Sequence, residues 1–332
     1  MIGRHRHLIG LEDLSREEIL LVLALATSMK EVLRRPLKKV PTLRGKAVVN
    51  LFFEASTRTR TSFETAAKIL SADAVNWTAS SSSVSKGETL LDTARNIEAM
   101  RPDLLVIRHP AGGAPRFIAD RVGCSVVSAG DGAHEHPSQG LLDMYTLAEH
   151  FTRNSGGAKD GAPDFATLSG RTVTIVGDVT HSRVARSNLH GLLKLGARVR
   201  VCGPPTMIPP GIEALGASVY YHLRPAVEGA DAVMMLRIQH ERIGDPLLPG
   251  TREYSKIWGL NEKKVNEWLS PSCAILHPGP INRGVELSPE VADGPRSVIL
   301  EQVENGVAVR MAILYLLAGA APAEPAEGAA RA

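Results

Sequence analysis

Short runs of strand-forming residues alternate with longer helical patterns along most of the chain, and this alternation constrains the fold more than any other feature. The first four runs cover residues 47–53, 74–77, 104–107 and 125–127. Strands separated by helices pair in parallel, because each helix carries the chain back to the start of the next strand. We therefore expect an α/β fold built on a doubly wound parallel sheet with helices on both faces.

A second series of the same kind follows a polar segment. Residues 152–164 are rich in Asn, Ser, Gly, Lys, Asp and Pro, which favours a surface linker or loop. Beyond it, strand patterns resume at 172–176, 199–202, 218–221, 232–236 and 274–276. A chain of 332 residues is also longer than one typical domain. We therefore expect two doubly wound domains, at residues 1–150 and 151–300.

Helices are predicted near both ends of the chain. Ser15 and Glu18 form a capping-box pattern, which begins a helix that runs to about residue 35. In residues 301–318, apolar side chains recur every three or four positions, at Val303, Val307, Met311 and Leu314. Such a stripe must be covered by another surface. The remaining residues, 319–332, are Gly, Ala, Pro, Glu and Arg, and we expect them to be disordered.

The composition excludes several classes of protein. With 44% hydrophobic residues, 22% charged residues and a net charge of +3, the chain is typical of a globular protein, and no nucleic-acid partner is indicated. Cys124, Cys202 and Cys273 lack the spacing of a disulfide framework or a metal site, so we expect no metal. The longest apolar run, 19–26, is too short to span a bilayer. We expect a cytoplasmic protein without a membrane partner.

The sequence Ser-Thr-Arg-Thr-Arg at residues 56–60 follows the first apolar strand and leads into a helix. A helix start offers unpaired N–H groups, the hydroxyls of Ser56, Thr57 and Thr59 add donors, and an arginine adds a two-pronged charged donor. Such turns lie at the carboxyl ends of strands, where α/β sheets bind ligands. We interpret this segment as a phosphate site, the alternative being a helix cap with solvated arginines.

Two further residues of the first half stand at the same sheet edge. Arg108 directly follows a strand, and His136 precedes a helix that begins at about residue 137. A histidine at a helix start can donate to a carbonyl oxygen that becomes negative in a transition state. Taken singly, each has an ordinary alternative, a surface arginine and a structural histidine.

In the second half, Arg237 and Gln239 follow a strand and share one side of it, where they could hold a carboxylate. An exposed charged loop is the alternative. Arg183 begins a helix after Gly177, but the G-x-G-x-x-G pattern is absent, so no dinucleotide cofactor is indicated. The prolines of 277–280 make a stiff turn whose carbonyl groups could accept from an amide N–H₂.

The order and spacing of these segments resemble the aspartate carbamoyltransferase catalytic chain, within the aspartate/ornithine carbamoyltransferase superfamily. The matching segments are 56–60, 85–88, 136–139, 237–239 and 277–280. The resemblance implies a first domain that binds carbamoyl phosphate, a second that binds L-aspartate, and a last helix, 301–318, that returns to the first domain. It also implies a homotrimer in which a loop reaches into the site of the neighbouring subunit.

The resemblance further implies the role of each residue. The catalytic residues would be Arg58, Thr59, Arg108 and His136. Carbamoyl phosphate would be bound by Ser56, Thr57, Arg58, Thr59, Arg108, His136, Gln139, Pro278, Gly279 and Pro280. L-Aspartate would be bound by Lys86, Arg183, Arg237 and Gln239, with Ser82 and Lys86 supplied by the neighbouring subunit.

The implied reaction transfers a carbamoyl group to L-aspartate in pyrimidine biosynthesis, without cofactor or metal. Position 85 is serine where some members carry a second lysine. An ornithine carbamoyltransferase is the nearest alternative, but an arginine such as Arg237 would repel a cationic side chain. A non-catalytic scaffold of the same fold is the second alternative. A larger assembly with regulatory chains or a dihydroorotase-like protein stays open.

Overall fold

The structure is a computed structural model that describes residues 1–78, 88–156, 161–238 and 250–319. Its first sheet has the strand order β2-β1-β3-β4 and consists of β1 (Ala47–Phe52), β2 (Asp73–Thr78), β3 (Leu104–His109) and β4 (Ser125–Asp131). The second has the order β7-β6-β5-β8-β9 and consists of β5 (Thr172–Val176), β6 (Arg198–Cys202), β7 (Ser218–Tyr220), β8 (Ala232–Met235) and β9 (Ala274–Leu276). Neighbouring strands in both sheets pair in parallel. The predicted pair of parallel-sheet domains is confirmed.

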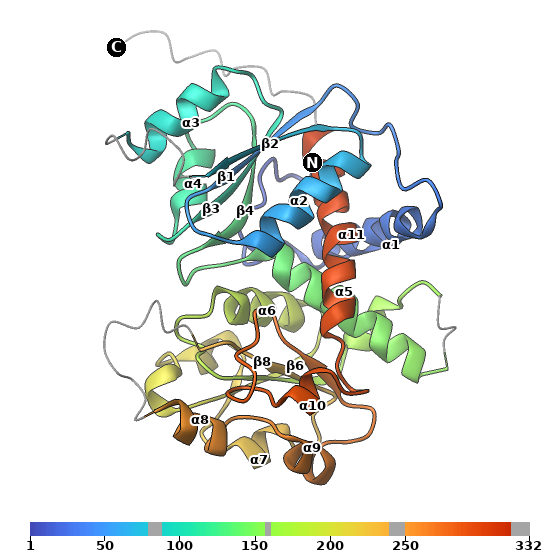
Figure 1. Ribbon diagram of the computed structural model, residues 1–332, viewed down its shortest axis with the longest axis vertical. Helices are drawn as coiled ribbons and strands as arrows, with labels where there is room; N and C mark the ends of the chain where they lie inside the picture. Colours follow the sequence, from blue (N-terminus) through green and yellow to red (C-terminus); the bar gives the residue numbers. More distant parts are fainter. Residues whose placement is uncertain (79–87, 157–160, 239–249, 320–332) are drawn as a thin grey trace.

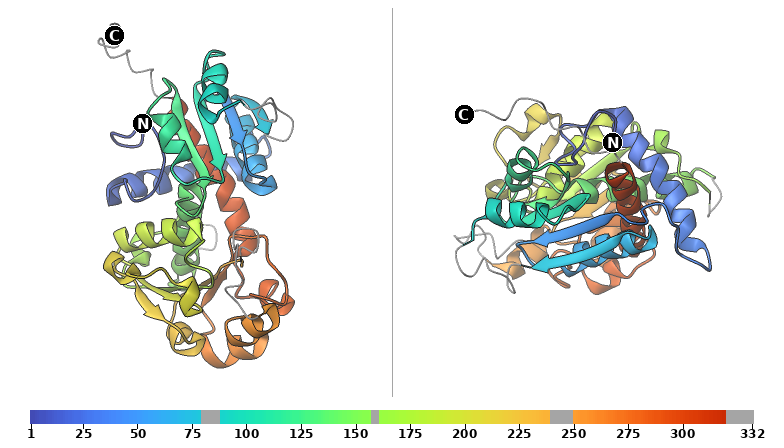
Figure 2. Two further views of the ribbon diagram at one scale, coloured as in Figure 1. Left: turned by 90° about the vertical axis from the view of Figure 1, so that its left-hand side faces the viewer. Right: turned by 90° about the horizontal axis from the view of Figure 1, so that it is seen from above.

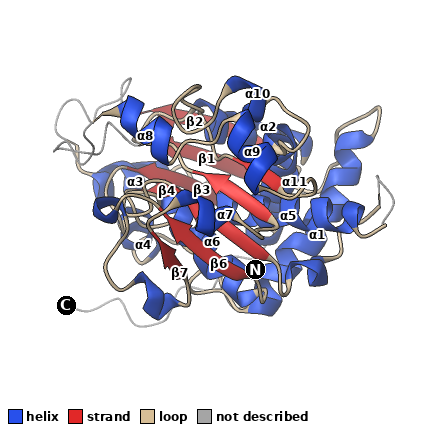
Figure 3. Cartoon of the chain, turned by 90° about the horizontal axis from the view of Figure 1, so that it is seen from below, coloured by secondary structure: helices blue, strands red, loops and turns tan. Residues whose placement is uncertain are grey.

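Helices lie on both sides of the strands, as the view from below shows (Figure 3). They are α1 (Arg16–Arg34), α2 (Thr57–Ile69), α3 (Leu90–Glu98), α4 (Ala114–Ala119), α5 (Pro137–Asn154), α6 (Arg183–Lys194), α7 (Leu223–Val227), α8 (Thr251–Ile257), α9 (Glu262–Trp268), α10 (Pro289–Ala292) and α11 (Ile299–Ala318). Because helices cover both faces of the second sheet, its inner strands β5 and β8 are buried along their whole length. This explains why they appear in the sequence as short, nearly continuous apolar runs.

The capping box predicted for the first helix is present in the structure. The Ser15 hydroxyl accepts from the Glu18 N–H at 3.2 Å, and the Glu18 carboxylate accepts from the Ser15 N–H at 2.8 Å. These bonds satisfy two backbone donors that a helix start leaves without partners.

Two long helices run between the two sheets, as Figures 1 and 2 show for α5 and α11. Helix α5 continues past residue 150 to Asn154 and packs on both α6 and α11. Residues 157–160 of the predicted linker and 320–332 of the predicted tail lie outside the described residues. The division of the chain at residue 150 therefore stays a prediction.

Helix α11 packs against α1, α2 and α5, so it returns to the first half of the molecule as predicted. The prediction of a single apolar stripe was wrong. Met311 and Leu314 are fully buried, but Val303 is 51% exposed, and every residue from 308 to 314 is buried. Three helices cover α11 at once, so its central part is enclosed on nearly all sides. Among the described residues, no helix is both long enough and apolar enough to cross a membrane.

A buried polar network ties α11 to α1 and α5. The Lys30 Nζ donates to Glu149 Oε1 and to Asn305 Oδ1, each at 2.6 Å. The Asn305 Nδ2 in turn donates to Glu149 Oε2 at 2.8 Å and to Thr146 Oγ1 at 3.0 Å. Removing one partner of such a network leaves a charge or a polar group buried without compensation.

We predict that Lys30→Met lowers the free energy of unfolding by about 3 kcal/mol, because it leaves the Glu149 carboxylate without its cation. Urea unfolding measures the change. The matched control is Lys263→Met, whose pair with Glu267 spans 3.9 Å between side chains that are 80% and 54% exposed. Its effect should stay below about 0.5 kcal/mol, and equal losses in the two variants would contradict the assigned role of Lys30.

Candidate active site

One cavity of about 430 Å³ lies between the two sheets and collects residues from both halves of the chain. The predicted site residues that line it are Ser56, Thr57, Arg58, Thr59, Arg108, His136, Gln139, Arg183, Arg237, Pro278, Gly279 and Pro280. Three other predicted residues, Ser82, Lys86 and Gln239, lie outside the described residues. The structure thus brings together every predicted site residue that it describes. Arg237 is among them, so the alternative that it belongs to an exposed charged loop is not supported.

The start of α2 faces this cavity. Ser56 is the N-cap residue but makes no side-chain capping bond, and the first turn of the helix holds no acidic residue. The backbone N–H groups of the first turn therefore retain capacity to donate, and the positive end of the helix dipole adds to the attraction for an anion. The geometry is that of a phosphate-binding turn.

Five arginines line the cavity, namely Arg58, Arg108, Arg183, Arg237 and Arg310, whereas Glu54 is the only acidic residue among its described lining residues. Partial loss of solvent around its guanidinium, together with the nearby charge of Arg237, lowers the pKa of Arg58. Arg58 belongs to the first half of the chain and Arg237 to the second, so their mutual repulsion shows that the two halves direct positive charge at the same space. An anionic ligand placed there would relieve that repulsion.

Glu54 holds two of these arginines in place. Its Oε1 accepts from the Arg108 Nη2 at 2.7 Å and from the Arg183 Nη2 at 2.5 Å, and its Oε2 accepts from the Arg183 Nη1 at 3.1 Å. Arg108 also donates to the backbone oxygen of Ala129 at 3.1 Å. One carboxylate thus joins an arginine of the first sheet to an arginine at the start of α6.

The turn after β9 is held by its histidine. The Nδ1 of His277 accepts from the Gly279 N–H at 2.7 Å, so the ring proton lies on Nε2, which donates to Glu286 Oε1 at 3.1 Å. Burial lowers the pKa of His277, which keeps the ring neutral. The rigid turn presents residues 278–280 to the cavity.

Gly279 is the point of closest approach between this turn and Arg58. Its φ is +63°, in the left-handed region, and a Cβ there would lie 1.7 Å from the Arg58 Nη1. Any other residue would displace the guanidinium, so the phosphate motif and the distant turn depend on each other.

Sequence reasoning missed several residues of the cavity. Arg310 is buried, its Nη1 donates to Ser62 Oγ at 2.9 Å, and its guanidinium lies 5.2 Å from the centre of the Phe63 ring. Burial lowers the pKa of Arg310 to about 10, so it remains charged. The other lining residues that were missed are Glu54, Ala55, Ser62, Leu142, Ser182, Val184, Leu236, His277, Ile299, Gln302 and Val303.

Position in the sequence offered a signal for only some of these residues. Glu54 and Ser62 flank the phosphate motif, and His277 belongs to the predicted turn. Gln302 and Arg310 reach the cavity only because α11 folds back against the first half, and no local pattern marks them.

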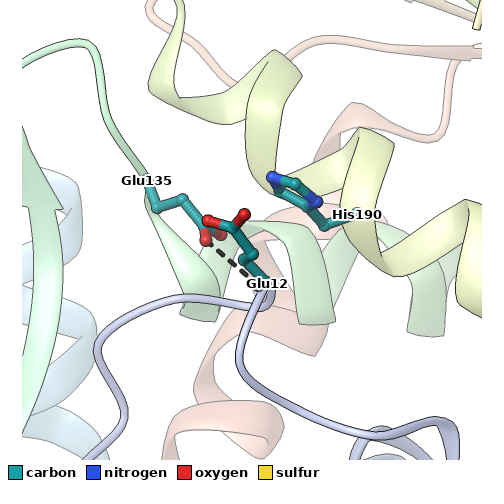
Figure 4. A group of neighbouring side chains, drawn as sticks. All are labelled: Glu12, Glu135 and His190. Carbon is teal, nitrogen blue, oxygen red and sulfur yellow. Dashed lines mark hydrogen bonds between the residues drawn. The ribbon is translucent and has the colours of Figure 1, made fainter. Parts of the chain in front are cut away.

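A separate group of three side chains has the composition of a metal site and consists of Glu12, Glu135 and His190. Figure 4 shows this group between the N-terminal segment and α6. Glu135 is fully buried, and its carboxylate accepts from the N–H groups of Leu11 and Glu12 and from the Ser187 hydroxyl. The third member, His190, has its pKa lowered by burial. Because the Glu135 oxygens already have these donors, we assign the group a structural role in fastening the N-terminal segment.

We predict that Gly279→Ala weakens the binding of inorganic phosphate by about tenfold or more, because the new Cβ displaces a charged donor of the anion site. Calorimetric titration measures the dissociation constant. Gly284→Ala is the matched control, since Gly284 also has a positive φ, +82°, but no atom lies within 4 Å of its Cβ position. Both variants carry similar backbone strain, so phosphate affinity that falls equally in both would contradict a specific contact with Arg58.

Comparison with known proteins agrees with this geometry over nearly the whole chain. Residues 6–149 match the family described as Aspartate/ornithine carbamoyltransferase, carbamoyl-P binding domain, and residues 169–317 match its Asp/Orn binding domain. The aspartate carbamoyltransferase catalytic subunit of Anaeromyxobacter sp. (strain Fw109-5) is 75% identical over 330 residues, which cover 99% of this chain and 100% of that protein. The catalytic subunit of Geobacter sulfurreducens is 61% identical over 317 residues, or 95% and 97% of the two chains.

Solved structures of two enzymes share the fold. Aspartate transcarbamoylase from Trypanosoma cruzi, in complex with carbamoyl aspartate and phosphate, has a TM-score of 0.80 and 27% identity, covering 93% of this chain and 94% of that one. Ornithine carbamoyltransferase from Thermus thermophilus has a TM-score of 0.79 and 27% identity, covering 94% and 99%. With both halves of the sequence matched and the arginines of both halves converging on one cavity, the chain belongs to the aspartate/ornithine carbamoyltransferase family.

Proposed function

We propose that this protein transfers the carbamoyl group of carbamoyl phosphate to the amino group of L-aspartate, forming N-carbamoyl-L-aspartate and phosphate in de novo pyrimidine biosynthesis. The observation that carries the proposal is that Arg58 and Arg237, from the two halves of the chain, line one cavity, close enough for the charge of Arg237 to contribute to lowering the pKa of Arg58. Two anionic reactants need such a site, because they repel each other in water. Two relatives that are 75% and 61% identical to this chain are named as catalytic subunits of this enzyme.

In this proposal the start of α2 holds the phosphate group. Ser56, Thr57, Arg58 and Thr59 donate to its oxygens from backbone and side chain, and Arg58 adds a charged two-pronged contact. Gln139 and the carbonyl groups of Pro278 and Gly279 accept from the carbamoyl N–H₂. Pro280 completes the turn that supports them.

L-Aspartate has two carboxylates and therefore needs cationic partners from more than one direction. Arg183 and Arg237 line the cavity from the second half of the chain, and we assign them to these carboxylates. Gln239 and Lys86 are assigned to the same ligand, and Lys86 with Ser82 belongs to the neighbouring subunit of a homotrimer. Residues 1–150 thus serve carbamoyl phosphate, and residues 151–300 serve aspartate.

The reaction follows from this arrangement. The neutral α-amino group of aspartate attacks the carbamoyl carbon, and the carbonyl oxygen gains negative charge that Thr59, Arg108 and His136 stabilise. One well-placed donor of this kind contributes about 3 kcal/mol to the transition state. Holding both reactants in attack geometry contributes a further rate gain through effective concentration. The new C–N bond forms in this attack, the C–O bond to phosphate then breaks, and the proton that the amine loses leaves with the phosphate.

We predict that the purified protein carbamoylates L-aspartate and shows no turnover with L-ornithine, since Arg183 and Arg237 repel an ammonium side chain. A colorimetric assay of the carbamoylated product with each amine at equal concentration measures this. Preferential turnover of ornithine would assign the protein to the other branch of the family, and turnover of neither amine would support a non-catalytic scaffold.

We also predict that two arginine variants affect different ligands. Arg58→Ala should abolish detectable binding of carbamoyl phosphate, whereas Arg237→Ala should raise the KM for aspartate by about a hundredfold, equivalent to the loss of one charged hydrogen bond. Equilibrium binding of carbamoyl phosphate and steady-state kinetics separate the two effects. Equal losses for both ligands in both variants would contradict the division of labour.

The homotrimer is part of the proposal, and subunit mixing tests it. Arg58→Ala and Lys86→Ala subunits should each be nearly inactive when pure. In the proposed trimer each site takes Arg58 from its own subunit and Lys86 from the neighbour. When the two variants are reassociated in equal amounts, about one quarter of the sites should therefore contain both residues. Activity of the mixture should therefore exceed that of either parent severalfold, and a mixture as inactive as its parents would exclude a shared site.

We place the protein in the cytoplasm. Its three cysteines are free, and burial raises the pKa of Cys202 and of Cys273 to about 12, so both remain thiols. A reducing compartment suits such a chain. Whether the trimer stands alone or joins regulatory chains or a dihydroorotase-like protein is decided by its size in cell extract.

A further inference from the structure

A fully buried carboxylate lies directly behind the cavity, on α5. Asp143 is one helical turn after Gln139, and three side-chain amides donate to it. The Nε2 atoms of Gln139 and Gln302 both donate to Oδ1, at 2.9 and 2.7 Å, and the Nδ2 of Asn188 donates to Oδ2 at 2.7 Å. Asp143 itself does not line the cavity, whereas both glutamines do.

This network determines which way the Gln139 amide faces. Burial raises the pKa of Asp143 to about 6, so the group is ionised at pH 8 and can only accept hydrogen bonds. Each surrounding amide must therefore turn its N–H₂ end toward Asp143. The Oε1 of Gln139 is left as the end that the side chain presents to the cavity.

The second arm of the network reaches the turn after β9. Gln302 donates to Asp143 through Nε2, and its Oε1 accepts from the His277 N–H at 3.0 Å. His277 in turn accepts from the Gly279 N–H. Asp143 therefore also orients, through Gln302, the segment whose carbonyl groups border the cavity.

The Oε1 of Gln139 and the carbonyl groups of the turn after β9 are hydrogen-bond acceptors in a cavity that otherwise offers mainly donors. Its arginines and the α2 start all donate, which suits phosphate and carboxylate oxygens. A carbamoyl N–H₂ group is itself a donor and needs acceptors, whereas the methyl group of acetyl phosphate, which is close to it in size, needs none. A site built to pair with a substrate N–H rejects the analogue that lacks it, because its own polar groups then stay unpaired.

We propose that Asp143 is a positioning residue that makes the site select carbamoyl phosphate over acetyl phosphate, by holding the oxygen of Gln139 and the turn of residues 277–280 toward the carbamoyl nitrogen. It acts through Gln139 and Gln302 and touches neither reactant. The inference rests on the proposed function and adds to it the origin of selectivity for the acyl group.

The test compares two ligands in the full-length enzyme at pH 8. The selectivity ratio is the kcat/KM for carbamoyl phosphate, measured at saturating L-aspartate, multiplied by the inhibition constant of acetyl phosphate. In Asp143→Asn, one carboxylate oxygen becomes an N–H₂ group, so a single acceptor oxygen is left for three amides. At least one of these amides then faces the new N–H₂ group, donor to donor. We expect this selectivity ratio to fall about tenfold to a hundredfold, with the acetyl phosphate inhibition constant changed by less than about threefold.

Two variants keep the test decisive if Asp143→Asn fails to fold. Gln302→Met removes an amide from Oδ1 and the acceptor of the His277 N–H, and it should lower the ratio. Asn188→Ser removes the amide on Oδ2, and Asn188 does not line the cavity, so the ratio should stay at the parent value although stability falls. Thermal unfolding of each variant reports on stability separately.

Equal weakening of carbamoyl phosphate and acetyl phosphate, or a parent-like ratio in Asp143→Asn or Gln302→Met, would overturn the inference. The same holds if Gln302→Met and Asn188→Ser change the ratio alike. A parent enzyme without activity on carbamoyl phosphate and aspartate would instead overturn the proposed function, so the two failures are distinguishable.

Discussion

Repulsion among the arginines that line one cavity is the constraint on which this structure depends. Arg58 and Arg237 approach each other across the cavity, and partial loss of solvent together with that approach lowers the pKa of Arg58. The fold must hold these charges together before any ligand neutralises them, and Glu54 does so for Arg108 and Arg183. Two bound anions relieve this repulsion, because each of them exchanges water for donors that the fold already holds in place.

The helices between the sheets make that arrangement rigid. Helix α5 carries Gln139 and Asp143, and α11 carries Gln302 and Arg310, so the wall of the cavity belongs to the same elements that join the two halves. The network of Lys30 fastens these helices at some distance from the chemistry. A site assembled from both sheets can therefore hold two reactants in the close and defined geometry that their reaction requires.

Much of the fold could be predicted from local pattern. Strand patterns were found for all nine strands of the described residues, and the inner ones were recognisable because a buried parallel strand is a short apolar run bounded by polar residues. The phosphate motif was recognisable because strand, turn and helix start are adjacent in sequence. Other parts could not be predicted in this way: the stripe proposed for the last helix was wrong at Val303, since the number of helices that cover α11 is set by packing and not by its own periodicity.

The sequence by itself determined two parallel sheets, the donors at residues 56–59 and the candidates Arg108, His136, Arg183 and Arg237, since each depends on neighbours a few positions away. Only the tertiary structure decided that these residues share one cavity, that Gly279 lies against Arg58, and that Gln302 and Arg310 reach the site from α11. The physical reason is distance along the chain. Contacts between residues more than a hundred positions apart arise from how helices and sheets pack, and no local spacing records them.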